Sequence, residues 1–343
     1  GAGVGKEIRD YQEDNDRKPL WTNSIYGGMP SFFAGLRLEN YLRHIERLFQ
    51  FYTGRPIGVF LGMMIVTYFS LIALGFSPFI AFIGGLSFGF ATNNLILFSA
   101  GHMKKVMTLM YMPFVISGAI LLVRKTWFLG TLLLTLGIAM GLMHTHIQMT
   151  YYLFLCLLIV AIVYMVDFIK RKDFVDLGKV LALVVLAAVL SLATNASRMW
   201  TTYEYSEETV RGKPILEKAS EGGESPGEES GYAWEKAMMW SNNGLDVLAG
   251  LIPRIVGGGS GERIGEGKTY DALKRARQGA GRDGRYQLPT YWGGLPFTEA
   301  PIYFGAVILF LSVLALFTVK GPLKWAFIIP IVFTILLSMG SNF

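Results

Sequence analysis

Histidines and lysines gather at two turns between apolar segments. The stretch "SAGHMKKVMTLM" carries His102, Lys104 and Lys105, and "GLMHTHIQMTYYLF" carries His144 and His146. Both turns are expected where helix ends meet water beside lipid. Charge-assisted donors in that position suit the phosphate of a lipid headgroup. We therefore predict lipid-phosphate binding by these five residues, with a purely structural interfacial role as the alternative.

A second polar group follows the sixth apolar segment, in "NASRMWTTYEYSEETVRGKPIL". Arg198 could bind the same phosphate, because a guanidinium donates to two phosphate oxygens at once. Trp200 and Tyr203 could stack on a sugar or anchor the chain at the interface. Gln148 and Tyr151, beside the second histidine turn, are assigned with them to substrate binding.

Three carboxylates are candidates for a general base, namely Glu7, Asp10 and Glu299. A base of this kind removes a proton from an attacking hydroxyl. Asp10 also belongs to an acidic run that could simply be solvated. Glu299 follows Thr298 and precedes Pro301, which is a pattern typical of a helix start.

Other site chemistries have little support. His144 and His146, two residues apart, would point about 200° apart on one helix, so they suit a turn better than a shared metal site. No metal or other cofactor is assigned, and a divalent metal remains the less favoured alternative. In "IVGGGSGERIGEGKTYDALKR", Glu262 stands where a phosphate-binding loop needs glycine. Neither a nucleotide nor a nucleic acid is an expected partner.

The elements that must position these residues are membrane helices. The chain has 343 residues, of which 52% are hydrophobic and 16% charged, and this composition is unlike that of a soluble domain. Its apolar residues form eight blocks long enough, or nearly so, to cross a bilayer. The blocks are 57–75, 77–98, 106–123, 126–143, 150–168, 178–194, 302–319 and 325–340. The predicted fold is an all-α polytopic membrane protein, with the second block interrupted by glycine and asparagine.

Lysine and arginine are distributed unevenly between the two sides. One set of short connections carries Arg124, Lys125, Lys170, Arg171, Lys172, Lys179, Lys320 and Lys324, whereas the opposite set carries Lys104 and Lys105. The positive-inside rule places the richer set in the cytoplasm. We therefore expect four regions: outer loop 1–56, six helices in 57–194, outer loop 195–301 and two helices in 302–343.

Three local patterns refine the outer loops. Apolar residues recur at helical spacing over 38–52, which indicates an amphipathic helix that lies on the membrane or packs on protein, with Glu46 on its charged face. The turns in "YGGMPSFF" and "YWGGLPFTEAPIYF" share an aromatic-Gly-Gly-x-Pro core and are predicted to wall one cavity. Residues 217–230, rich in Gly, Ser and Glu, are predicted to be mobile.

Six stretches in order carry a family resemblance: "PLWTNSIYGGMPSFF", "GHMKKVMTLMYMP", "HIQMTYYLF", "ATNASRMWTTYEYSEETVRGKPIL", "LIPRIVGGGS" and "LPTYWGGLPFTEAPIYFGA". With these stretches the chain resembles the bacterial YfhO-like membrane proteins of the GT-C glycosyltransferase superfamily. That resemblance implies a GT-C-like helix bundle in the bacterial cytoplasmic membrane with its functional face outside. It also implies an acidic residue in a segment before Gly1, so we expect the chain to be a piece of a longer protein.

The activity implied by the resemblance is transfer of a sugar from a polyprenyl-phosphate carrier to an extracytoplasmic acceptor. Its partners would be the polyprenyl-phosphate-linked sugar and membrane lipids. Two alternatives stay open. A transporter or flippase would use the same headgroup pocket without a base, and a non-catalytic subunit would act with partners in a membrane envelope complex.

Overall fold

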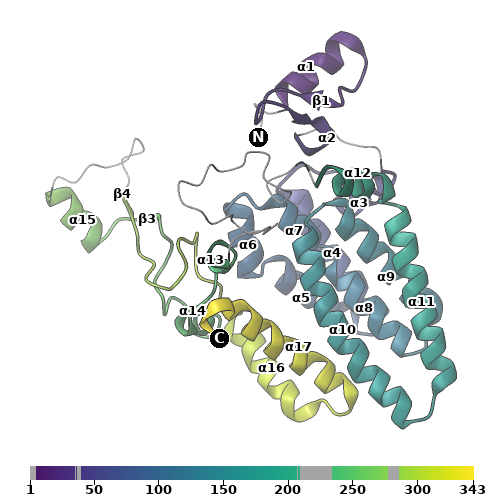
Figure 1. Ribbon diagram of the computed structural model, residues 1–343. Helices are drawn as coiled ribbons and strands as arrows, with labels where there is room; N and C mark the ends of the chain where they lie inside the picture. The colour runs from purple at the N-terminus through teal and green to yellow at the C-terminus, as the bar shows by residue number, and fades with distance from the viewer. Residues whose placement is uncertain (1–4, 35, 37–39, 207, 209–233, 277–285) are drawn as a thin grey trace, which may run out of the picture.

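The fold of the chain is described by a computed structural model for residues 5–34, 36, 40–206, 208, 234–276 and 286–343. All eight predicted apolar blocks are helical (Figure 1). The helices of these blocks are α4 (Ile57–Ala73), α5 (Pro78–Gly89), α6 (Thr92–Ser99), α7 (Met103–Leu109), α8 (Met112–Val123), α9 (Trp127–Met143), α10 (Ile147–Lys170), α11 (Phe174–Ala193), α16 (Ala306–Thr318) and α17 (Pro322–Met339).

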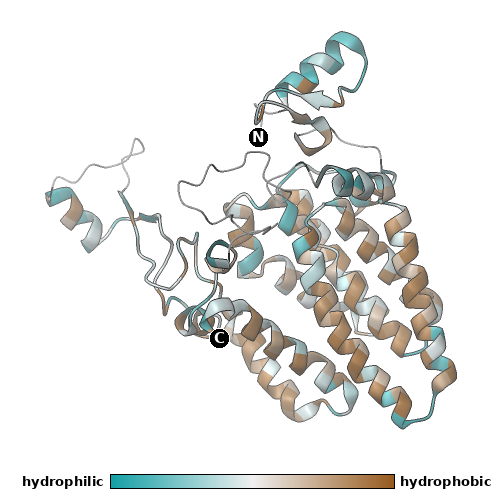
Figure 2. Ribbon diagram, in the orientation of Figure 1, coloured by the Kyte–Doolittle hydropathy of each residue, from teal (hydrophilic) through white to brown (hydrophobic). Residues whose placement is uncertain are grey.

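Five helical stretches are long and apolar enough to cross a membrane: Pro78–Ser99, Met103–Val123, Ile147–Lys170, Phe174–Ala193 and Pro322–Asn342. Three shorter apolar helices are Ile57–Ala73, Trp127–Met143 and Ala306–Thr318. Figure 2 shows hydrophobic residues along the bundle and hydrophilic ones at its ends and in the outlying segments. The described part of the chain is therefore mainly helical and has the character of a membrane protein.

Two of the predicted blocks contain breaks. The second divides into α5 and α6 around Ala91, whose ψ of 134° is extended, and Asn94 Nδ2 donates to the Phe88 carbonyl at 2.6 Å there. The Phe88 carbonyl also accepts from the Ala91 N–H at 3.2 Å, so the Asn94 side chain adds a second donor at the break. The third block divides into α7 and α8 near Tyr111, and α7 begins at Met103. Lys104 and Lys105 therefore belong to a helix, and their predicted place in a turn is wrong.

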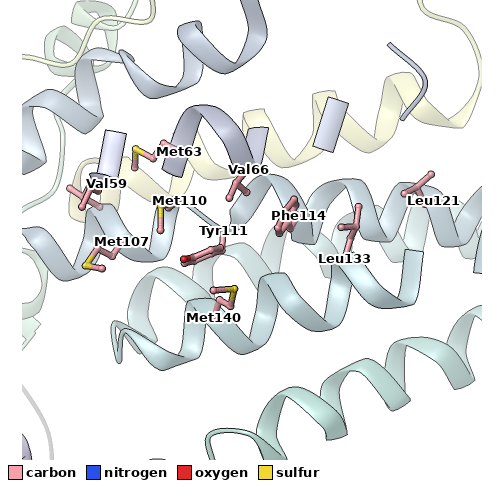
Figure 3. Close-up of a cluster of buried hydrophobic side chains, with 11 residues drawn as sticks. Val59, Met63, Val66, Met107, Met110, Tyr111, Phe114, Leu121, Leu133 and Met140 are labelled. Atoms are coloured by element: carbon pink, nitrogen blue, oxygen red, sulfur yellow. The ribbon is translucent and has the colours of Figure 1, made fainter. Parts of the chain in front are cut away.

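The main core lies where α4, α7, α8 and α9 meet. Its buried side chains are Val59, Met63, Val66, Val106, Met107, Met110, Tyr111, Phe114, Leu121, Leu133 and Met140 (Figure 3). A smaller cluster joins α8 and α9 to α11 through Ala187. In contrast, α10, α11, α16 and α17 expose many large apolar side chains. Exposed apolar surface on this scale is expected on helices that face lipid.

Helices α8 and α9 approach closely because glycines line their contact. A Cβ added to Gly118 would lie 2.5 Å from the Leu134 backbone nitrogen. A Cβ on Gly130 would lie 2.8 Å from the Leu122 nitrogen, and one on Gly137 the same distance from the Val115 nitrogen. Small residues permit such backbone contact between membrane helices.

The turns rich in lysine and arginine lie at one end of the bundle. Lys125, after α8, forms ion pairs with Asp173 at 2.9 Å and with Asp176, at the start of α11. Arg124 Nη1 donates to the Leu74 carbonyl, after α4, at 3.1 Å. The connections after α4, α8 and α10 thus meet. Helices α3 (Leu42–Phe49), α7 and α12 (Ala196–Ser206) share the other end (Figure 1).

The predicted amphipathic helix packs on protein over its apolar face. Leu42, Ile45 and Phe49 of α3 contact the main core, and the Phe49 and Phe114 rings are 5.6 Å apart. The prediction that Glu46 lies on the charged face is wrong, since this residue is only 8% exposed. The reason is a partner on α9, described below, which no periodicity could indicate.

An N-terminal unit precedes α3. It comprises α1 (Lys6–Asn15), β1 (Trp21–Thr22), β2 (Met29–Pro30) and α2 (Ser31–Ala34), with β1 and β2 antiparallel. A Cβ on Gly28, whose φ is +133°, would lie 2.8 Å from Trp21 Nε1. The first Gly-Gly-x-Pro turn therefore packs on its own hairpin. Phe33 links this unit to the bundle through a ring contact with Tyr205 of α12 at 5.4 Å.

The second Gly-Gly-x-Pro turn belongs to a separate outlying segment. That segment contains α13 (Trp234–Met238), α14 (Gly244–Ala249), β3 (Glu262–Ile264), α15 (Lys268–Arg275) and β4 (Tyr286–Leu288), with β3 and β4 antiparallel. The turn packs on α14, because Tyr291 Oη and the Gly294 N–H donate to Asp246 at 2.6 and 2.9 Å. Figure 1 places α14 far from β1. The prediction of one cavity shared by the two turns is therefore wrong.

The glycine-rich stretch serves close backbone packing. Gly258 N donates to the Thr290 carbonyl at 3.2 Å, and Thr290 N donates to the Gly259 carbonyl at 3.0 Å. A Cβ on Gly257, at φ +84°, would lie 1.9 Å from the Thr290 oxygen. These glycines let two backbone segments approach, which explains the motif without a phosphate ligand. Residues 217–230, predicted to be mobile, lie outside the described residues.

Candidate functional site

A group of basic residues forms a rim at the end of the bundle where α3, α7 and α12 meet. We call it the basic rim and define it as Arg43, His102, Lys104, Lys105, His146 and Arg198. His102 directly precedes α7, His146 directly precedes α10, and Arg198 lies in the first turn of α12. The fold thus brings together five predicted phosphate-binding residues, two of them just before helices, two in α7 and one in α12, and adds Arg43 from α3.

His146 shows that the two predicted turns are neighbours. Burial lowers its pKa, and the positive charges of Lys105, His102 and Lys104 lower it further. Its Nδ1 accepts a hydrogen bond from the Met149 N–H at 3.4 Å, which requires that nitrogen to be unprotonated. His146 is therefore a neutral member of the rim at pH 7, and its other ring nitrogen can donate a hydrogen bond.

Arg198 is the most informative residue of the rim. Burial lowers its pKa, with a further contribution from the like charge of Arg43, and Lys104 lies within electrostatic range as well. Within the described ranges no carboxylate forms an ion pair with Arg198, Lys104 or Lys105. Half-buried cations that repel one another are stabilised when an anion binds between them.

His144 differs from the other predicted phosphate-binding residues. Its Nε2 lies 3.0 Å from Glu46 Oε1, an ion-pair distance whose geometry is not that of a hydrogen bond. The His144 ring stacks parallel to Tyr111, with centroids 6.0 Å apart, and its side chain is only 10% exposed. Gln50 Nε2 donates to the same Glu46 oxygen at 3.3 Å. The His144 ring is therefore nearly buried, with its Nε2 facing Glu46, and its assignment to phosphate binding stays a prediction.

The three predicted acids occupy different surroundings. Glu7 accepts a hydrogen bond from Thr22 Oγ1 at 2.6 Å and one from the Asn23 N–H at 3.3 Å, and these bonds lower its pKa. A carboxylate held in this way is a weaker base than a free one. Asp10 is exposed on α1, as expected of a solvated acidic run.

Glu299 is the predicted acid tied to the bundle end that carries the rim. Its Oε1 accepts a hydrogen bond from Ser99 Oγ, at the end of α6, at 3.1 Å. The predicted helix start at 298–301 is wrong, since α16 begins at Ala306. Ser260 Oγ accepts from the Thr298 N–H at 2.9 Å, and Ser260 N donates to the Thr298 carbonyl. These tertiary bonds replace the helical ones.

The predicted substrate-binding residues lie on α10 and α12. Gln148 Nε2 donates to Tyr152 Oη at 2.9 Å, so this amide already has a partner within its own helix. Tyr151 is exposed, and Trp200 and Tyr203 are exposed on the helix that carries Arg198. Exposed aromatic rings beside a cationic site are compatible with sugar stacking and with interfacial anchoring alike.

No group of three or more His, Cys, Asp or Glu that could hold a metal occurs among the residues that the structure describes.

No family model, curated protein or solved structure matches this chain. The resemblance to the YfhO-like family therefore stays a prediction, and a function must be argued from the rim itself.

Proposed function

We propose that this protein is a membrane glycosyltransferase that takes a sugar from a polyprenyl-phosphate carrier at the basic rim. The observation that carries this proposal is the half-buried Arg198, whose charged neighbours in the described part of the chain are cations. The rim borders helices with exposed apolar faces, so a lipid carrier could reach it from the bilayer. A phosphate is the anionic part of such a carrier, and an arginine with nearby lysines is well suited to bind it.

The charge change of the reaction explains why cations are needed. When the acceptor oxygen bonds to the anomeric carbon, the bond from that carbon to the carrier phosphate breaks. The carrier changes from a phosphodiester with one negative charge to a phosphomonoester that can carry two. Fixed positive charges at the departing oxygen stabilise this developing charge. Arg198, Lys104 and Lys105 supply this positive charge.

Glu299 is the proposed general base. It would accept the acceptor hydroxyl proton as the new glycosidic bond forms. Glu299 accepts a hydrogen bond from Ser99. Ser99 lies three residues before His102, at the α6–α7 turn that carries part of the rim. Glu7 and Asp10 belong to the N-terminal unit, and among the described residues no hydrogen bond or ion pair joins them to the rim.

The rim is proposed to lie outside the cytoplasm, on the strength of the charge asymmetry between the two bundle ends. A topology test can use Asp14→Cys, exposed on α1, and Lys172→Cys, exposed in the opposite turn, both with Cys156→Ser. We expect a membrane-impermeant maleimide to label Asp14→Cys in intact cells and Lys172→Cys only after lysis. The reverse pattern would place the rim in the cytoplasm and contradict the proposed function.

Binding and transfer should separate in variants of the full chain reconstituted in nanodiscs. Arg198→Gln is expected to weaken binding of a polyprenyl phosphate about tenfold or more, because a charge-assisted bond contributes roughly 1.5–3 kcal/mol. Lys172→Gln, at the opposite end, is the matched control. Glu299→Gln should keep binding but lose transfer of a radiolabelled sugar from its polyprenyl phosphate.

Each outcome has a defined meaning. Unchanged affinity in Arg198→Gln would remove the phosphate from the rim. Normal transfer by Glu299→Gln would remove the base from this position. Carrier binding without any transfer by the unmodified chain, together with movement of the carrier between leaflets, would favour the flippase alternative instead.

A further inference from the structure

Helix α14 of the outlying segment carries an exposed apolar face. Its side chains are Leu245, Leu248, Leu251 and Ile252, which are between 39% and 51% exposed. The Leu251 and Ile252 N–H groups donate to the Leu248 carbonyl at 2.9 and 2.8 Å, so helical turns continue past the end of α14. The spacing of these four residues then places them on one side of the helix. We call them the α14 patch.

Hydrogen bonds fix the position of this patch relative to two apolar helices. The Phe304 N–H, two residues before α16, donates to the Gly250 carbonyl at 3.0 Å. The Asn242 N–H donates to the Ser338 carbonyl, in the last turn of α17, at 2.9 Å. Figure 1 accordingly shows α14 beside the ends of α16 and α17. The patch therefore lies at the level where these two helices leave the apolar part of a bilayer.

The charged residues next to the patch are held by partners within the protein. Asp246 accepts hydrogen bonds from Tyr291 Oη and the Gly294 N–H, as described above. Arg254 Nη2 donates to Glu262 Oε1 at 2.9 Å. The four patch residues are themselves uncharged. Contact of the patch with an apolar phase therefore requires no ion to be stripped of water.

The surroundings of the patch match a lipid surface. Exposed apolar side chains continue from the patch to Phe304, which packs against Gly250, and then to Val307 in the first turn of the lipid-facing helix α16. Trp240, four residues before α14, is exposed as well, and its ring contacts Phe297 edge to face at 4.6 Å. Aromatic rings are enriched where helices leave the hydrocarbon, and a helix with one apolar face can lie there.

We propose that the α14 patch inserts into the membrane interface, with its four aliphatic side chains among the upper acyl carbons of the lipids. The occupant of this surface is the bilayer itself, because the patch continues the lipid-facing surface of α16. The outlying segment is thereby held on the membrane by a lipid contact of its own. This proposal concerns lipid contact alone and does not rest on the proposed function.

The test measures how close the patch comes to lipid. Leu248→Cys, in a chain with Cys156→Ser, is labelled with an environment-sensitive fluorophore and reconstituted in nanodiscs of phosphatidylcholine brominated at the upper acyl carbons. Thr269→Cys, exposed on α15 of the same outlying segment, is the matched control. The apolar face of an interfacial helix is buried roughly 5–10 Å, so bromine should quench the Leu248 label about twofold or more. The Thr269 label should be quenched by aqueous iodide instead.

The other outcomes overturn the proposal. Quenching of the Leu248 label by iodide and not by bromine would place the patch in water. Protection of this label from both quenchers would show that protein covers the patch. Equal bromine quenching at both positions would show that the whole segment lies on lipid, without a special part for α14. If Leu248→Cys fails to reconstitute, Leu251→Cys provides the same comparison on the same face.

Discussion

Replacing Glu46 by alanine is expected to lower the free energy of unfolding by about 1–3 kcal/mol, the range for leaving buried polar groups without their partner. The Glu46 and His144 side chains are 11% and 10% exposed, and Glu46 Oε1 lies 3.0 Å from His144 Nε2. Without Glu46, His144 and Gln50 lose their partner in surroundings that water reaches poorly. The measurement is denaturant or thermal unfolding of the purified protein in one detergent.

Two variants make this test specific. Glu13→Ala removes an exposed glutamate of α1 and should change stability by less than about 0.5 kcal/mol. The double variant Glu46→Leu/His144→Leu should recover much of the lost stability, because apolar residues can replace a complete buried pair at little cost. A Glu46→Ala protein as stable as the unmodified chain would show that α3 does not depend on this pair. Loss of phosphate affinity in parallel is expected, since α3 carries Arg43.

Replacing Gly118 by alanine is expected to destabilise the protein by about 1–3 kcal/mol, through overpacking of the α8–α9 contact. The added methyl group would meet the Leu134 nitrogen at 2.5 Å and the Gly130 oxygen at 2.8 Å. Both are backbone atoms, so relief requires the helices to separate rather than a side chain to rotate. The cost then spreads to the core residues on both helices.

The same substitution at Gly178 provides the control. Gly178 lies inside α11 with no atom within 4 Å of an added Cβ. Alanine there should stabilise the protein by about 0.5–1 kcal/mol, because glycine is the poorer helix former. Opposite signs for the two substitutions, measured by thermal unfolding in the same detergent, are the expected result. Destabilisation of equal size at both positions would point to a general sensitivity of the helices to alanine and contradict the packing argument.

Hydrophobicity and charge alone predicted the helical segments and the grouping of their turns. A segment that must bury its backbone polar groups in an apolar surrounding forms a helix, so the eight blocks could be found without tertiary information. The excess of lysine and arginine in alternate turns likewise predicted that these turns share a side. The structure agrees, since Lys125 reaches Asp173 and Asp176 across two of them.

Part of the candidate site could be located from the sequence because basic residues at helix ends are local features. His102, Lys104, Lys105, His146 and Arg198 could be found from residue type and from their position beside apolar blocks. Arg43 could not, because its relevance depends on α3 lying against the start of α12. The sequence around an arginine in an amphipathic helix does not indicate which residues of another helix lie opposite it.

His144 and Glu46 show most clearly what only the tertiary structure decided. By itself, His144 is a basic residue at a helix end, and Glu46 is a polar residue on an amphipathic helix. Residue type and helical spacing determined both of those descriptions. Their pairing depends on the crossing of α3 over the end of α9. There each side chain takes the place of water as the polar partner of the other. Long-range contacts of this kind are set by how helix faces fit together, and that fit is not contained in the pattern of any single segment.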